Sequence, residues 1–71
     1  MAVAGVEVKA SGTVRSRDFR GLRKLRGALG DRFAGGVVVY DGEATVPFGD
    51  RLHGVPARRL FGGSEMTVEA G

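Results

Sequence analysis

Apolar residues are spaced differently in successive parts of this chain, and the spacing predicts a strand, a helix and a second strand. Residues 3–10 are rich in valine and are followed by a Ser-Gly-Thr break, which is typical of a β-strand. A helix is predicted over residues 16–29, where apolar side chains recur every three or four positions: Phe19, Leu22, Leu25 and Leu29. The unbroken apolar run at 37–40 is typical of a strand buried on both faces. Such a strand–helix–strand crossover gives parallel strands.

Turn signals divide the rest of the chain. Asp41-Gly42 predicts a hairpin, so that residues 43–48 return as a strand, with a proline near its end that suits a sheet edge. Residues 52–55 form a short extended segment, and Pro56 is placed to begin a final helical turn.

These elements predict an α/β fold. It consists of a βαββ unit with a mixed sheet, one amphipathic crossover helix and a short C-terminal helical turn. We expect residues 1–61 to form this unit and residues 62–71 to be a flexible tail.

Composition narrows the setting of this fold. The chain has 71 residues and no cysteine, so its small core would have no disulfide or thiolate–metal site to stabilise it. A lack of cysteine is typical of the reducing cytoplasm, where we expect the protein. No apolar run approaches the roughly 20 residues that span a bilayer, so we expect no membrane partner.

Positive charge is concentrated on the face of the predicted helix opposite its apolar stripe. The net charge of the whole chain is only +3. A basic face of this kind binds nucleic acid or an acidic protein in some molecules and is simply solvated in others. The candidate nucleic-acid-binding residues are Arg17, Arg20, Arg23 and Lys24.

Glu7 and Lys9 are the candidate catalytic residues. Residues two apart on a strand share a face, so these two side chains lie together while Val6 and Val8 are expected under the helix. Glu7 would coordinate Mg²⁺, and Lys9 would orient the attacking water or stabilise charge on a phosphate. The alternative is an ordinary polar strand face, since a nuclease site needs a second carboxylate from a neighbouring strand. We expect no such strand before Met1.

Two further features of the sequence argue against a histidine ligand site and against an ATP site. His53 is the single histidine, and we expect it to be a surface or packing residue rather than a ligand. Neither a P-loop nor a GxGxxG pattern is present, so we expect no ATP site in this chain.

Several runs of the sequence together resemble a known family, namely residues 5–14, 18–25, 28–33, 36–42 and 46–52. They are similar to the last part of a prokaryotic family of AAA-type ATP-binding proteins. The resemblance implies an N-terminal P-loop ATPase domain in the parent protein. It also implies that this part belongs to a C-terminal domain of unknown function with a PD-(D/E)xK-like, restriction-endonuclease-type fold.

The resemblance assigns Glu7 and Lys9 to the second half of the acidic motif of that fold. The leading hypothesis is therefore a fragment that is non-catalytic alone, with ATP bound only by the absent parent domain. One alternative is a Mg²⁺-dependent nuclease half-site completed by another chain. Another is a small basic module that binds nucleic acid or protein. An unpaired sheet edge beside residues 3–10 predicts marginal stability and self-association.

Overall fold

The computed structural model describes residues 1–60 and contains one four-stranded sheet and two helices. The strands are β1 (Val3–Lys9), β2 (Phe33–Tyr40), β3 (Val46–Pro47) and β4 (Leu52–Pro56). The helices are α1 (Arg20–Leu29), which lies between the 3₁₀ turns Ser16–Phe19 and Gly30–Arg32, and α2 (Ala57–Leu60). The tail predicted over 62–71 lies outside the described residues.

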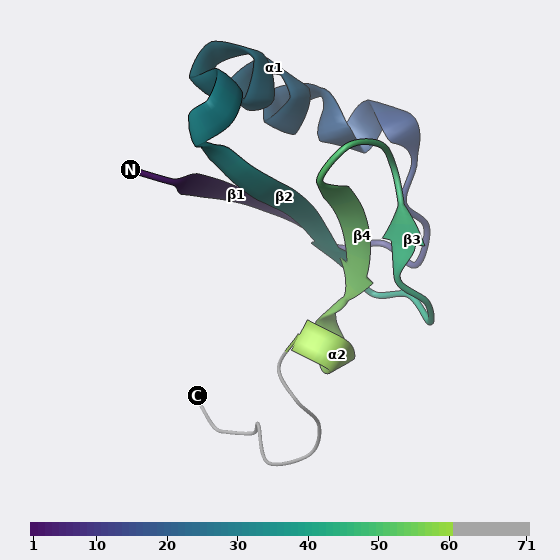
Figure 1. Ribbon diagram of the computed structural model, residues 1–71. Coiled ribbons are helices and arrows are strands. Elements are labelled where there is room, and N and C mark those ends of the chain that lie inside the picture. Colours follow the sequence, from purple (N-terminus) through teal and green to yellow (C-terminus); the bar gives the residue numbers. More distant parts are fainter. Residues whose placement is uncertain (61–71) are drawn as a thin grey trace.

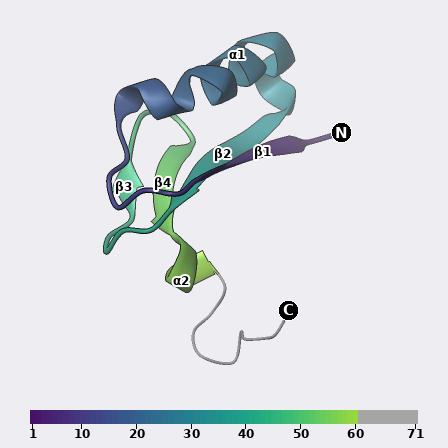
Figure 2. The ribbon, with the colours of Figure 1, turned by 180° about the vertical axis from the view of Figure 1, so that it is seen from behind.

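The sheet is mixed, with the strand order β1-β2-β4-β3. β1 and β4 each pair with β2 in parallel, and β3 pairs with β4 in antiparallel. α1 crosses one face of the sheet, and α2 lies on the other side, beyond the ends of β2 and β4 (Figures 1 and 2). The predicted α/β class and the parallel crossover through α1 are therefore confirmed. Neither helix within residues 1–60 is long and apolar enough to cross a membrane.

The predicted hairpin after the second strand is wrong. Residues 41–45 form a wide loop instead of a tight turn, and β4 takes the place beside β2 that β3 was expected to hold. The Tyr40 ring packs against this loop: a Cβ on Gly42 would lie 2.0 Å from Tyr40 Cε2, and the Tyr40 hydroxyl donates to the Ala44 carbonyl. The backbone N–H of Asp41 donates to the Ser11 carbonyl at 2.8 Å, which directs the chain sideways.

The core lies between α1 and the sheet. Its buried side chains come from the turn before α1, from α1 itself, and from β2 and β4: Phe19, Leu22, Phe33, Val38 and Leu52. Leu25 and Leu29 are half-buried against this cluster, so the apolar stripe predicted for the helix is confirmed. The helix also ends where the sequence predicts, because Gly30 adopts a left-handed φ of 56° there.

The face of β1 that α1 covers is the opposite of the one predicted. Val6 and Val8 are 63% and 78% exposed, while Gly5, Glu7 and Lys9 lie on the helix side. Close packing of the helix explains this choice, since a Cβ on Gly5 would lie 2.5 Å from Leu22 Cδ2. A strand face with valine at that place would hold the helix away from the sheet.

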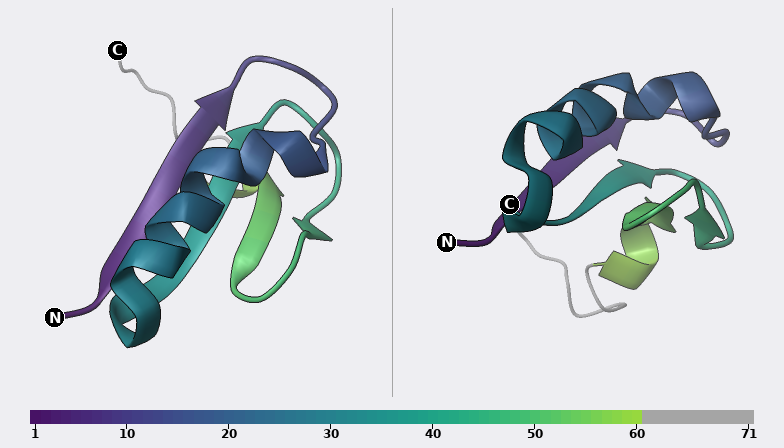
Figure 3. Two further views of the ribbon diagram at one scale, coloured as in Figure 1. Left: turned by 90° about the horizontal axis from the view of Figure 1, so that it is seen from above. Right: turned by 45° about the horizontal axis from the view of Figure 1, so that its top comes forward.

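Gly5 and Gly36 together form a flat platform beneath Leu22. They are direct partners across the β1–β2 pair. A Cβ on Gly36 would lie 3.1 Å from Leu22 Cδ2 and 3.2 Å from Leu52 Cδ2. The absence of two neighbouring side chains therefore sets how closely α1 approaches the sheet. Figure 3 shows α1 lying across one face of the sheet.

Candidate functional site

The end of β1 brings the two sequence-predicted catalytic residues to one face, as their spacing requires. Both side chains lie on the α1 side of the sheet. Glu7 is exposed, and its carboxylate lies beside the first turn of the helix, where a Cβ on Gly21 would be 3.3 Å from Oε2. Lys9 is half-buried under the 3₁₀ turn Ser16–Phe19.

Lys9 forms an ion pair that the sequence did not reveal. Its Nζ lies 2.6 Å from Asp18 Oδ2, and the same oxygen accepts the backbone N–H of Arg15 at 2.7 Å. Asp18 lies in the first turn of the helical segment, where a carboxylate interacts favourably with the helix dipole. Asp18 meets Lys9 because the crossover returns over the end of β1, a tertiary effect with no local sequence signal.

The ion pair favours the charged form of Asp18. The hydrogen bond from Lys9, and after it the hydrogen bond from the Arg15 backbone, lower the pKa of Asp18 below its ordinary value. Asp18 is therefore a carboxylate at neutral pH, and it holds the Lys9 ammonium against the start of the helical segment. The pair joins the end of β1 to the turn that leads into α1.

The ion pair predicts how acid affects the fold. Because the folded-state pKa of Asp18 is lowered, its stabilising contribution is complete above the ordinary aspartate pKa of about 3.9 and is lost as the pH falls through the lowered value. We expect Asp18→Asn to lower the melting temperature at neutral pH and to make it fall less steeply toward about pH 2.

Thermal melts followed by circular dichroism across this range measure the effect. Asp31 is an exposed carboxylate just after α1, so Asp31→Asn is the matched control. Parallel curves for the wild type and Asp18→Asn would show that the pair does not stabilise the fold.

The donor set at the end of β1 does not fit a magnesium ion by itself. Mg²⁺ takes near-octahedral oxygen ligands, with one or two carboxylates completed by water and substrate phosphates. Glu7 offers one exposed carboxylate here, whereas Asp18 is bonded to Lys9 and Arg15. Among residues 1–60, no three histidine or acidic side chains gather closely enough to hold a metal. Glu7 by itself therefore provides too few ligands to hold the ion.

The predicted basic face divides into two groups. Arg23 is engaged within the fold, because it donates to the Ser16 carbonyl and hydroxyl oxygens, each at 2.8 Å, and its guanidinium lies 6.0 Å from the Phe19 ring centre. Three cations remain exposed: Arg17, Arg20 and Lys24. The exposed group is therefore smaller than the sequence predicted.

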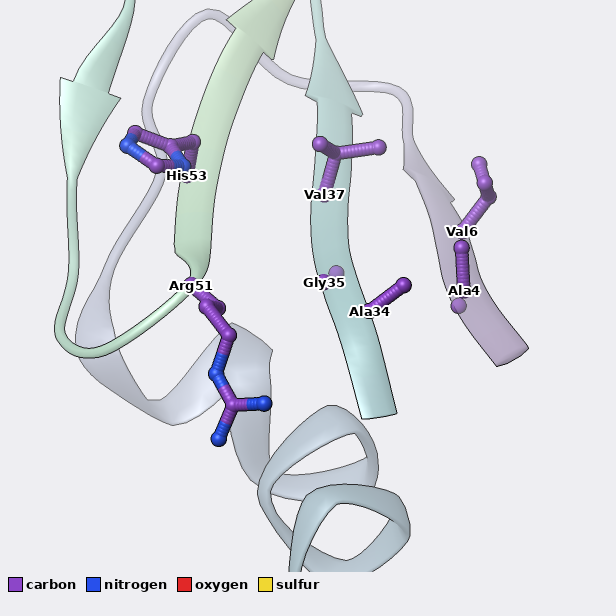
Figure 4. Close-up of a pocket in the computed structure, with 9 residues that line it drawn as sticks. Ala4, Val6, Ala34, Gly35, Val37, Arg51 and His53 are labelled. Carbon is purple, nitrogen blue, oxygen red and sulfur yellow. The ribbon is translucent and has the colours of Figure 1, made fainter. Parts of the chain in front are cut away.

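A groove of about 390 Å³ lies on the sheet face opposite α1. Figure 4 shows small and apolar side chains from β1 and β2 along it, with Arg51 and His53 at one side. Arg51 is already engaged, since its guanidinium donates to the Phe33 carbonyl and lies 5.4 Å from the centre of the Phe33 ring. His53 is exposed, which confirms that it is a surface residue. The valine pattern of β1 predicts that this face lies under the helix, so the sequence does not indicate the groove.

The fold and this site define a small α/β unit with a charged strand end and an open sheet face. The chain matches the family model described as a domain of unknown function (DUF4143), over residues 1–60. It therefore belongs to this family. Comparison with curated proteins and with solved structures gives no significant match.

Proposed function

We propose that this chain is the C-terminal part of a PD-(D/E)xK-like domain in an AAA-type ATP-binding protein of the cytoplasm, and that alone it is non-catalytic. The membership in a family of unknown function over residues 1–60 is consistent with this. The strand that carries Glu7 and Lys9, the two residues that the resemblance assigns to the acidic motif, leads into the α1 crossover. ATP would be bound by the parent's ATPase domain.

The contact between Lys9 and Asp18 carries the non-catalytic part of the proposal. A catalytic lysine must direct its ammonium at a water or phosphate oxygen in the reacting geometry. Lys9 instead bonds Asp18 at 2.6 Å, and Asp18 also holds the Arg15 backbone. The lysine thus stabilises the strand–helix connection, and Glu7 is left as one exposed carboxylate.

A cleavage assay tests this proposal. We expect the purified chain to leave supercoiled plasmid DNA intact in the presence of Mg²⁺, and Glu7→Ala to give the same result. Gel electrophoresis of the plasmid over time is the measurement. Mg²⁺-dependent nicking that Glu7→Ala abolishes would overturn the proposal.

A half-site completed by another chain is the second candidate. The exposed position of Glu7 on β1 favours it, because β1 is an edge strand and a neighbouring strand could bring a second carboxylate beside it. In the cleavage assay this candidate requires nicking that rises more than linearly with protein concentration.

A basic binding module is the third candidate, and the exposed Arg17, Arg20 and Lys24 favour it. Contacts between these cations and phosphates would retard DNA without cutting it, and the retardation would weaken as salt is added. The same plasmid, examined by mobility shift, therefore separates the three candidates.

A further inference from the structure

Within residues 1–60, the sheet has one long open edge. β1 contributes seven residues and pairs with β2 on one side only, since it is the first strand in the sheet order. The other edge is β3, which has two residues, one of them Pro47. Short edge strands and proline discourage pairing with another chain, whereas a long regular strand invites it.

Exposed apolar side chains are concentrated on this same strand. Among residues 1–59, the large hydrophobic residues that are exposed are Met1, Val6 and Val8, before β1 or within it. Val6 and Val8 stand on the groove side of the sheet, in cross-strand rows with Val37 and Val39 of β2. The apolar rows of the open face therefore continue up to the unpaired edge.

We propose that β1 forms an antiparallel pair with β1 of a second copy of this chain. A two-fold axis relates the two copies and places Val6 of one directly opposite Val6 of the other. The two four-stranded sheets would then form one continuous sheet with no long open edge. A two-fold contact of this kind uses the same strand twice, so it needs a strand that is complementary to itself.

Side-chain chemistry selects the register. Residues directly opposite one another in an antiparallel pair point to the same face of the sheet. A two-fold axis normal to the sheet therefore places one residue of β1 directly opposite its own copy, and we name the axis by that residue. An axis through Glu7 would place two carboxylates opposite each other, which is unfavourable. An axis through Val6, the midpoint of Val3–Lys9, pairs all seven residues. It places Val6 against itself, Ala4 against Val8, and Gly5 against Glu7.

The position of α1 is compatible with this pairing. α1 lies across the sheet on one face (Figure 3), so it leaves the backbone edge of β1 free to pair. The flank of α1 above β1 carries the exposed small residues Gly21 and Ala28, with Lys24 between them toward solvent.

Sedimentation velocity over a range of protein concentrations tests the interface. We expect the full chain to be a dimer that becomes a monomer on dilution, and Val6→Lys to remove the dimer, since two ammonium groups would meet at the axis. Val6 is 63% exposed, so the variant should retain the circular dichroism spectrum of the wild type. Thr45→Lys adds the same charge at an exposed position of the loop before β3 and should leave the dimer intact.

Single cysteines test the register independently, because the chain has no native cysteine. Mild oxidation should link Val6→Cys to its own copy, and Val8→Cys should remain largely unlinked because it faces Ala4 of the other copy. A wild type that stays monomeric at every concentration would overturn the proposal. So would a dimer that survives Val6→Lys, or linkage at Val8 in place of Val6.

Discussion

Replacing Phe19 by alanine is expected to leave most of the chain unfolded at 25 °C. Phe19 is completely buried, and its ring stacks on Phe48 with centres 4.6 Å apart. Removing a buried phenylalanine typically costs about 3–5 kcal/mol. A core of this size rarely supplies more than about 3–5 kcal/mol in total. The loss is therefore comparable to the whole stability of the fold.

Thermal and urea melts followed by circular dichroism measure this loss. Phe48→Ala is the matched control, because it removes the same stacked pair from a side chain that is only half-buried. We expect Phe48→Ala to remain folded with a lower melting temperature. A cooperative melt of Phe19→Ala near that of the wild type would show that the core does not depend on this ring.

Gly5→Ala is expected to destabilise the protein by about 1–3 kcal/mol, although it adds a single methyl group. The new Cβ would lie 2.5 Å from Leu22 Cδ2 and 3.0 Å from Leu25 Cδ2, so the two leucines or the whole helix must shift. Leu22 is almost fully buried and has little room to move. Urea denaturation gives the change in the free energy of unfolding.

The same substitution at Gly27 is expected to stabilise the protein. A Cβ on Gly27 meets nothing within 4 Å, and the residue lies inside α1. Alanine is favoured over glycine there by about 1 kcal/mol, so this variant should be more stable than the wild type. If Gly5→Ala also proved neutral or stabilising, the close approach of α1 to β1 would not be limited by the glycine platform.

The sequence predicted the elements that depend on local spacing. Phe19 and Leu22 repeat at helical intervals, and Gly30 marks the end of the helix, so α1 could be placed without knowing its neighbours. The parallel pairing of β1 with β2 followed from the length of the crossover.

The sequence could not decide which face of β1 the helix covers. Valine burial favours one face, but the helix can approach only where Gly5 and its partner Gly36 leave room, and that depends on a pairing made through space. The same limit applies at the candidate site. The spacing of Glu7 and Lys9 places both side chains on one face of the strand. The hydrogen bond from Lys9 to Asp18, in contrast, depends on the path of the crossover.

The parallel pairing of β1 with β2 also sets the order of events during folding. Val3 pairs with Phe33 and Lys9 with Tyr40, so no part of β1 gains a partner until the chain has closed the entire crossover. Closing such a loop costs chain entropy before any strand contact offsets it, so non-local pairing slows folding. Until that closure, the valines of β1 remain in water with both strand edges unpaired. Capture of nascent chains by one another therefore competes with folding at this stage, and the competition grows with concentration.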